Sequence, residues 1–162
     1  MSTNKNRIYV SVSNDLFSDQ RVDKTCNTLV SMGFEVTVVG RKLPNSLPLS
    51  HRNYATKRLK LMFKTGALFY AELNIRLFWF LIMKKHSVLL ANDLDTLLAN
   101  YWVSKIRRAT LVYDSHEYFT EVPELENGSF AKNTWLKIEK NIFPKLKKAY
   151  TVCDSIAEIY SK

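Results

Sequence analysis

The sequence predicts an α/β fold, a doubly wound and mainly parallel Rossmann-like sheet, on two observations. Short β-branched and apolar runs alternate along the chain with segments in which apolar residues recur at helical spacing. The runs are almost continuously apolar, as expected for parallel strands that helices cover on both faces. With 162 residues, 46% of them hydrophobic, the chain can form a single domain with a full core.

The first 40 residues predict a strand, a helix and a second strand. Residues 7–12 form a β-branched and aromatic run, and Ser18 can cap the helix that follows a short polar loop. Gly33 ends this helix, and residues 34–39 form the second strand. Such a unit implies parallel strands joined by a right-handed crossover. The apolar stripe of the helix comprises Val22, Cys26, Leu29 and Val30.

The middle of the chain predicts a loop, a third strand and a long helix. Residues 40–56 contain two prolines and little periodicity, so we expect an exposed loop, followed by a strand with one polar face over residues 58–63. Residues 66–85 are the most apolar stretch, but Glu72 and Arg76 interrupt it, and a charge at mid-bilayer costs about 3 kcal/mol. We therefore expect a mostly buried crossover helix, with docking on a membrane surface as the alternative.

The second half predicts further β-α units. Strands are expected over residues 87–91, 110–113 and 149–153. A helix over residues 94–108 should turn one side inward, formed by Leu94, Leu97, Leu98, Trp102 and Ile106.

Another helix should begin at a Ser129 cap, carry Trp135, Ile138 and Ile142, and break at Pro144. A last helix begins at Asp154 and has barely started at Lys162, which suggests that the chain is a fragment of a longer protein.

Polar side chains follow three of the predicted strands at the points where these strands end. Because the carboxyl ends of parallel strands meet at one edge of a sheet, these side chains should converge on one crevice, where open α/β sheets bind ligands. His116 is the member most able to exchange a proton near neutral pH. The converging residues are Asn14 and Asp15 after the first strand, Asp93 and Asp95 after the fourth, and Asp114, His116 and Glu117 after the fifth.

Each of these residues also has a purely structural alternative. Asp15 can shape a turn, and Asp93 can cap the helix that starts at Leu94. Asp114 can be a satisfied carboxylate at a strand end, and His116 can be a structural loop histidine. Because these residues are expected to converge on one crevice, the group as a whole indicates a functional role more strongly than any one residue does alone.

The chain is strongly basic, with a formal net charge of +9 at pH 7. The excess lies mainly in residues 41–64, which contain no acid, and in residues 132–148, where six lysines face Glu139 alone. Basic faces attract nucleic acid, phosphorylated substrates or acidic lipid, and the alternative is a merely solvated surface. Nucleic acid is the least favoured of these partners, because no aromatic residues interleave on a basic strand face.

The two cysteines, Cys26 and Cys153, lie far apart and in no metal-binding or redox spacing. Both stand in apolar patterns, so we expect buried free thiols in a reducing compartment. The N-terminus has no apolar run long enough for a signal peptide, in agreement with a cytoplasmic location.

Several chemistries lack their motifs. None of the four glycines lies between the first strand and the first helix, so the dinucleotide fingerprint fails. The sequence also has no P-loop, no nucleophile elbow and no metal-ligand spacing. Dehydrogenase, kinase, α/β-hydrolase and zinc-hydrolase functions are therefore disfavoured.

Four segments resemble GT-B glycosyltransferases of the group 1, family 4 type. They read D-Q-R-V-D-K-T-C-N-T-L-V-S-M-G-F-E-V-T-V-V-G (19–40), V-L-L-A-N-D-L-D-T-L (88–97), L-V-Y-D-S-H-E-Y-F-T-E-V-P-E-L (111–125) and A-Y-T-V-C-D-S-I-A (149–157). They occur in the family's order, and the resemblance covers essentially the whole chain. It implies the N-terminal, acceptor-side domain of a two-domain enzyme whose nucleotide-sugar-binding domain is absent from this chain.

The resemblance also assigns residues to the site. His116 matches the histidine that faces the reacting sugar, and Asp93 matches the polar position after the fourth strand. The loop after the first strand lacks the glycines that many members have there, and Arg21 could supply a cation near a phosphate. The implied catalytic residue is His116, and the implied substrate-binding residues are Asn14, Asp15, Asp19, Arg21, Asp93, Asp95, Glu117 and Tyr118.

The family's reaction transfers a sugar from a nucleotide-sugar donor to an acceptor hydroxyl, typically with retention and without a metal or other cofactor. The resemblance implies a glycan or lipid-linked acceptor, a role in surface polysaccharide or glycolipid synthesis, and peripheral contact with the inner face of the cytoplasmic membrane. This domain alone should be inactive. The alternatives are a nucleotide-sugar epimerase of the same fold, or a non-catalytic module that binds an anionic partner.

Overall fold

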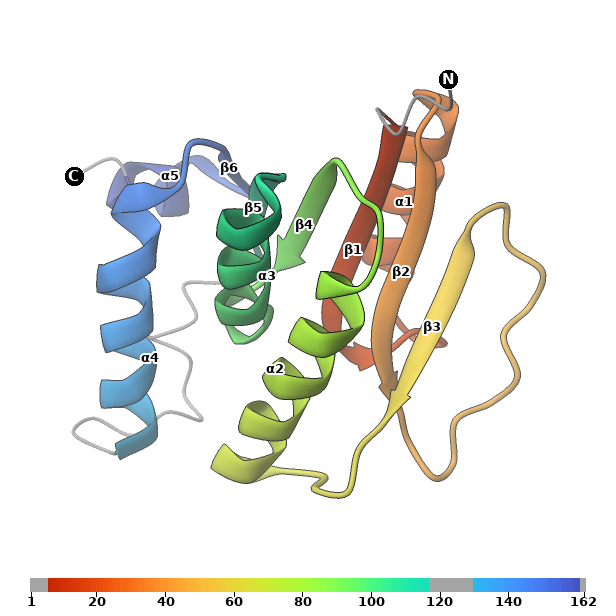
Figure 1. The fold of residues 1–162 in the computed structure, drawn as a ribbon, viewed down its shortest axis with the longest axis horizontal. Coiled ribbons are helices and arrows are strands. Elements are labelled where there is room, and N and C mark those ends of the chain that lie inside the picture. Colours follow the sequence, from red (N-terminus) through yellow and green to blue (C-terminus); the bar gives the residue numbers. More distant parts are fainter. Residues whose placement is uncertain (1–5, 117–129, 161–162) are drawn as a thin grey trace.

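The computed structural model describes residues 6–116 and 130–160, which form a six-stranded, entirely parallel sheet in the order β3-β2-β1-β4-β5-β6 (Figure 1). The predicted doubly wound α/β fold is confirmed. The strands are β1 (Arg7–Asp15), β2 (Glu35–Lys42), β3 (Ala55–Lys60), β4 (Val88–Asn92), β5 (Thr110–Ser115) and β6 (Ala149–Thr151). The helices are α1 (Gln20–Ser31), α2 (Gly66–Ile82), α3 (Leu94–Arg107), α4 (Phe130–Ile142) and α5 (Asp154–Tyr160), with a 3-10 turn at Phe143–Lys145.

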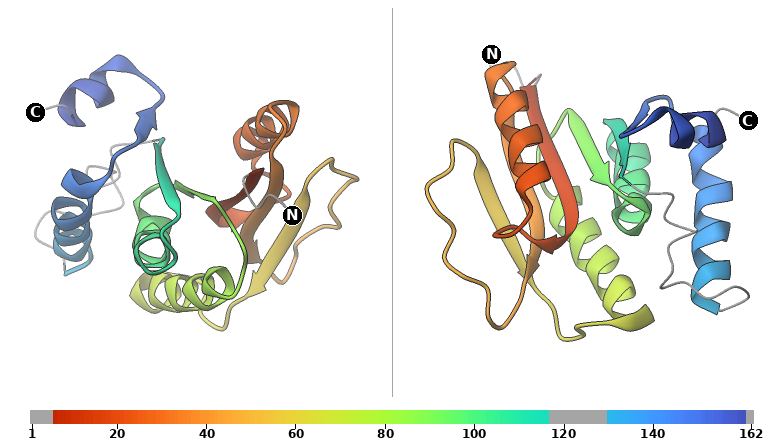
Figure 2. Two further views of the ribbon diagram at one scale, coloured as in Figure 1. Left: turned by 45° about the horizontal axis from the view of Figure 1, so that its top comes forward. Right: turned by 180° about the vertical axis from the view of Figure 1, so that it is seen from behind.

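Helices cover both faces of the sheet. Helix α1 packs on one face, and α2 and α3 pack side by side on the other (Figures 1 and 2). Alternate residues of β1 supply the two cores: Val10 lies in the core with Val22 and Cys26 of α1, whereas Tyr9 packs against the core formed with α2. The period-two alternation of a strand therefore divides the apolar residues between two helical layers.

Helix α2 is the expected crossover helix and buries Phe69, Leu73, Leu77 and Leu81. The prediction that it is mostly buried is wrong, because Leu68, Ile75 and Trp79 are exposed. Its interior Asn74 joins it to α3, because the amide donates to the Asp95 carbonyl at 2.7 Å and accepts from the Ala99 N–H at 3.1 Å. Among the described residues, no helix combines the length and apolar character needed to cross a bilayer.

Helix α3 buries Leu94 and Leu97 of the predicted inward face, but the prediction is wrong for Trp102 and Ile106. Trp102 and Ile106 are 53% and 59% exposed, whereas Asn100 is fully buried. The Ser11 hydroxyl of β1 donates to the Asn100 side chain at 3.3 Å, and Asn100 in turn donates to the Thr96 carbonyl at 2.9 Å. Apolar periodicity does not identify this part of the buried face, because a hydrogen-bonded polar residue occupies its centre.

The ends of several elements also differ from the prediction. Strands β1 and β2 each run three residues further than expected, whereas β3 begins and ends three residues earlier. Asp19, and not Ser18, caps α1, since its carboxylate accepts from the Val22 N–H at 3.0 Å. Cys26 is buried as predicted, but Cys153 is exposed. The predicted Ser129 cap lies outside the described residues.

The end of β1 crosses close to β2. The pairing of the two strands shifts register between Ser11 and Asp15. A Cβ atom on Gly40 would stand 2.6 Å from Leu16 Cδ2 and 2.8 Å from the Asn14 carbonyl oxygen. Only glycine fits this crossing, which sets the path of the loop after β1.

Candidate functional site

Asp93 forms the turn from β4 into α3 with an uncommon backbone, at φ 59° and ψ 168°. Such a conformation costs a non-glycine residue about 1–3 kcal/mol and persists where surrounding contacts hold it. The Asp93 side chain does not cap α3; its Oδ1 accepts from the His116 N–H at 2.9 Å. The Asp93 N–H donates to the Asp114 carbonyl at 2.8 Å. The turn therefore ties the ends of β4 and β5 together.

His116 lies with its ring between two carboxylates. Its Nε2 is 2.7 Å from Asp114 Oδ2, and its Nδ1 is 3.3 Å from Asp93 Oδ2. The Tyr150 hydroxyl of β6 also donates to Asp114 Oδ2, at 2.8 Å. The side chain of Asp114 is only 3% exposed, whereas that of Asp93 is 27% exposed. The Asp93 side of the ring is thus the side open to a ligand.

The charge of His116 follows from this arrangement. Burial lowers the pKa of the imidazole, but the hydrogen bonds and charges of Asp114 and Asp93 outweigh burial and raise the pKa to about 9. At neutral pH the ring is an imidazolium with both N–H groups available as donors. It can donate a charge-assisted hydrogen bond or stabilise negative charge, and it cannot accept a proton until the pH is well above neutral.

Asp95 is a second ionisable residue at the carboxyl edge of the sheet, and its surroundings there determine the pKa of its carboxyl. Burial raises the pKa of its carboxyl to about 7, and the charge of Asp93 adds to the rise. A hydrogen bond from Ser13 and the charge of Arg41 act in the opposite direction. Asp95 is 5% exposed, and its Oδ1 has no hydrogen-bond partner among the described residues. Ser13 of β1, Arg41 of β2 and Asp93 after β4 thus all contribute to its electrostatic environment.

The structure does not bring all the predicted residues to His116. The Asp15 carboxylate accepts from the Phe17 N–H at 3.1 Å and from the Ser46 hydroxyl, and lies 3.9 Å from the Arg58 guanidinium. Asp15 therefore holds the loops after β1 and β2 together. This is a structural role, the alternative to the expected role in the crevice. Asp19 caps α1.

The remaining predicted residues are placed as follows. The side chain of Asn14 is exposed, and its carbonyl faces Gly40. Arg21 is exposed, and its charge opposes the raised pKa of the Tyr150 phenol, so it lies on the Tyr150 side of the site. Glu117 and Tyr118 lie outside the described residues.

The sequence does not single out Tyr150 as a site residue. Tyr150 pairs with Asp114 in the β5–β6 register, which puts its hydroxyl against the same carboxylate as His116. A hollow of about 400 Å³ is lined by Tyr150 together with Tyr113, Ser115, Thr151 and Cys153, and neither Asp114 nor His116 lines it. The sequence does place a tyrosine in β6, the strand next to β5. It does not show which residue of β5 this tyrosine faces, because strand register cannot be read from one sequence.

No protein-family model and no curated protein sequence matches the chain, but solved structures do. A structure of sucrose-phosphate synthase from Thermosynechococcus elongatus superposes with a TM-score of 0.69 at 12% identity, over 94% of this chain and 79% of that one. A second structure of that enzyme gives 0.60 at 15% identity, over 89% of this chain and 41% of that one.

A protein from Listeria monocytogenes described as a UDP-N-acetylglucosamine 2-epimerase gives a TM-score of 0.54 at 13% identity, over 91% of this chain and 38% of that one. This chain therefore spans about two fifths of the length of the last two structures. These neighbours have the GT-B fold, and at such low identity they show that this chain shares the fold of one of its Rossmann-like domains.

Proposed function

We propose that the chain forms the acceptor-side half of a glycosyl-transfer site, completed by a nucleotide-sugar-binding domain. The observation that carries this proposal is the His116 imidazolium held between Asp93 and Asp114 at the carboxyl edge of a parallel sheet. That edge is where open α/β sheets bind ligands. The GT-B fold of the structural neighbours, whose names denote sugar-transferring and nucleotide-sugar enzymes, supports the same assignment.

In this proposal His116 donates a hydrogen bond through Nδ1 to a hydroxyl of the reacting sugar. Nδ1 faces the more exposed carboxylate at the longer distance, 3.3 Å, so a sugar hydroxyl can replace Asp93 as its partner. Asp114 holds Nε2, and the Tyr150 hydroxyl holds Asp114, so the ring is fixed on this side. The positive charge is placed to stabilise negative charge that develops as the nucleoside diphosphate leaves.

The reaction proposed is transfer from a nucleotide sugar to an acceptor hydroxyl, with retention and without a further cofactor. His116 then orients the sugar and supplies charge, and the acceptor proton passes to another group. A role in surface polysaccharide or glycolipid synthesis at the inner membrane face belongs to the same proposal, supported by the resemblance of residues 88–97 and 111–125 to such enzymes.

The test is turnover in the protein joined to its nucleotide-sugar-binding domain. His116→Ala should lower kcat by roughly tenfold or more while the fold persists. His86→Gln is the matched control, because His86 lies before β4 at the opposite edge of the sheet and contacts the Lys84 carbonyl at 3.1 Å. Turnover that survives in His116→Ala would remove this residue from the mechanism.

A nucleotide-sugar epimerase is the second candidate, favoured by the likeness to the Listeria monocytogenes structure. Product analysis separates the two reactions. A transferase should release its nucleoside diphosphate in proportion to an added acceptor, whereas an epimerase should convert the nucleotide sugar at a rate that no acceptor changes.

A further inference from the structure

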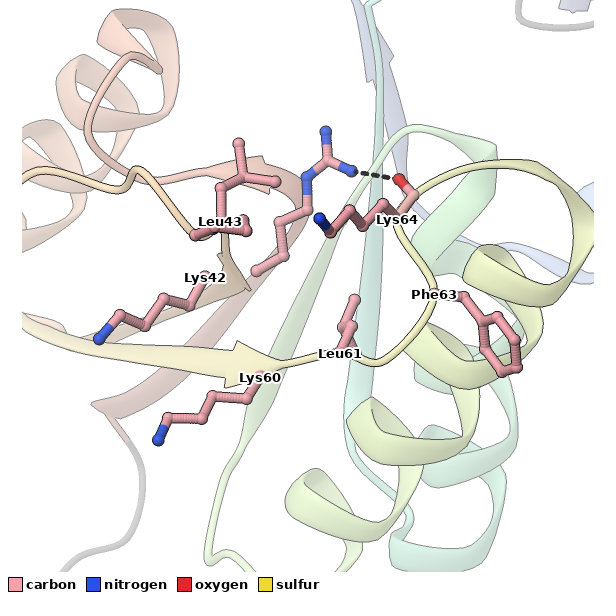
Figure 3. A pocket seen from close by; sticks show the side chains of 8 residues that line it. Lys42, Leu43, Lys60, Leu61, Phe63 and Lys64 are labelled. Carbon is pink, nitrogen blue, oxygen red and sulfur yellow. Dashed lines mark hydrogen bonds between the residues drawn. The ribbon is translucent and has the colours of Figure 1, made fainter.

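A basic pocket lies beside the candidate site, at the carboxyl ends of β2 and β3. It has a volume of about 280 Å³, and its cationic side chains come from Arg41, Lys42, Lys60 and Lys64 (Figure 3). The other four residues that line it are apolar, so no carboxylate balances these charges within the pocket. Among the described residues none of the four cations forms an ion pair.

Lys42 and Lys60 are direct neighbours across the β2–β3 ladder. Both are exposed, and Figure 3 shows their side chains extending the same way from the two strand ends. Like charges placed directly opposite each other on a sheet repel and destabilise the pairing. An anion bound between the two amines removes this repulsion, so the pair is arranged to favour an anionic ligand.

Arg41 is held more rigidly than the lysines. Its guanidinium is half-buried, donates to the Lys64 carbonyl at 3.3 Å, and lies 4.8 Å from the centre of the Phe69 ring. These contacts fix the planar group in advance, which lowers the entropy lost when an anion binds. The charge of Arg41 also acts on Asp95, where it opposes the rise in the pKa of the carboxyl.

We propose that this pocket binds a phosphoryl group of the acceptor. This inference rests on the proposed function and adds to it the chemical class of the substrate. Lys42 and Lys60 form one pair of amines at the pocket, whereas Arg41, the residue before Lys42 in β2, points to the opposite face of the strand. Two amines side by side suit a compact group that carries more than one negative charge, and arginine and lysine are the residues that bind phosphate. A single carboxylate carries too little charge to balance both amines.

The sheet order gives the distance between the phosphoryl group and the reacting hydroxyl. In the order β3-β2-β1-β4-β5-β6, β2 and β3 are three and four strands from β5, the strand that His116 follows. Neighbouring strands lie about 4.8 Å apart, so the pocket is roughly 14–19 Å from His116. One hexose ring does not span that distance, and the acceptor must carry its phosphoryl group further from the accepting hydroxyl.

The direct test uses inorganic pyrophosphate as the probe, titrated by calorimetry at constant ionic strength. The unchanged protein should bind pyrophosphate saturably, and Lys42→Gln with Lys60→Gln should weaken binding by about tenfold or more. Lys84→Gln with Lys85→Gln removes the same charge from the end of α2 at the opposite sheet edge, and should leave the affinity within about twofold. Equal weakening in both double variants, or no saturable binding, would overturn the proposal.

A competition experiment identifies the source of the phosphoryl group. Maltotriose 1-phosphate represents a soluble sugar phosphate longer than one hexose, and phosphatidylcholine vesicles with and without undecaprenyl diphosphate represent a lipid-linked acceptor. Displacement of pyrophosphate by only one of these ligands assigns the acceptor to that source. If neither displaces it at a concentration well above that of the protein, the pocket does not bind an acceptor phosphate.

The same titration distinguishes a failure of this inference from a failure of the proposed function. His116→Ala should leave the pyrophosphate affinity unchanged, because the pocket contains no part of the His116 cluster. Loss of transfer in that variant with intact pyrophosphate binding supports both statements. Intact transfer with intact binding contradicts only the role of His116, and transfer without pyrophosphate binding contradicts only the pocket.

Discussion

Asp93 holds His116 at two points with one carboxylate: Oδ1 accepts from the backbone N–H at 2.9 Å, and Oδ2 lies 3.3 Å from ring Nδ1. The backbone contact positions His116 at the end of β5, and the ring contact affects the protonation of the histidine. These two effects can be separated by substitution, because an amide retains an acceptor oxygen but loses the charge.

We therefore expect Asp93→Asn to lower the pKa of His116 from about 9 toward its ordinary value while the His116 backbone stays in place. Asp114→Asn should lower it further, because Asp114 is more buried and its oxygen is closer, at 2.7 Å. Titration of the imidazole resonances by NMR measures both variants. An unchanged His116 pKa in Asp114→Asn would show that this pair does not set the charge of the ring.

His116 should also make the stability of the protein depend on pH. Its folded-state pKa of about 9 lies above the ordinary value of 6.5, so its contribution is complete below pH 6.5 and is lost as the pH rises through 9. The contribution is about 3 kcal/mol. Urea unfolding of the protein and of His116→Gln should differ most in slightly acidic buffer and converge at high pH. A difference that does not change with pH would contradict the linkage.

Asp95 should have a destabilising effect at neutral pH. Its carboxyl pKa is raised from 3.8 to about 7, so the stability it contributes at low pH is lost as the pH rises through 7. Asp95→Asn cannot ionise and should be more stable than the unchanged protein above pH 7, by up to about 4 kcal/mol. Below pH 4 the two proteins should be alike. A gain of equal size at both pH values would mean that packing, and not charge, explains the effect.

The crossing of β1 over β2 predicts an intolerance at Gly40. Gly40→Ala should cost about 1–3 kcal/mol, because the new methyl group overlaps Leu16 and the Asn14 carbonyl. A double variant with Leu16→Ala should recover part of this loss, since two of the three close atoms belong to Leu16. Urea midpoints of the two single variants and the double variant measure the coupling. Strict additivity would show that the close approach does not limit this position.

The two thiols should react at very different rates. Hydrogen bonds from Ser155 and from the Ile156 backbone lower the pKa of the exposed Cys153, whereas burial raises the pKa of Cys26 to about 12. A disulfide reagent should therefore modify one thiol rapidly and the second only as fast as the protein unfolds. Cys153→Ser should remove the fast phase, and Cys26→Ser should retain it. A fast phase that persists in Cys153→Ser would contradict the assignment.

The sequence predicted the architecture because apolar runs and helical periodicity report burial directly. It also predicted that Asp93, Asp114 and His116 converge, since parallel strands share one carboxyl edge. It failed where hydrogen bonds, and not apolar contact, decide the structure. Helix α3 turns Asn100 inward because Ser11 of β1 pairs with it, and no periodicity encodes that pairing.

Asp15 shows the same limit within the candidate site. Topology brings it to the carboxyl edge, but its side chain turns to Ser46 and Arg58, which lie 31 and 43 positions further along the chain. Contacts of this separation depend on the path of the loop after β2. Tyr150 was missed for the opposite reason, since the register of β6 against β5 puts it on Asp114 and a single sequence does not contain that register.

The hydrogen bonds that join α3 to β1 have a consequence for motion. Asn100 accepts from Ser11, Asn92 donates to the Ser11 carbonyl at 3.1 Å, and Thr96 donates to the Asn92 carbonyl at 2.8 Å. These directional contacts are buried, so α3 cannot slide along the sheet without leaving polar groups unsatisfied. The wall that carries Asp93 is therefore rigid, and in the proposed two-domain enzyme any closure over a substrate would have to move this domain as one body.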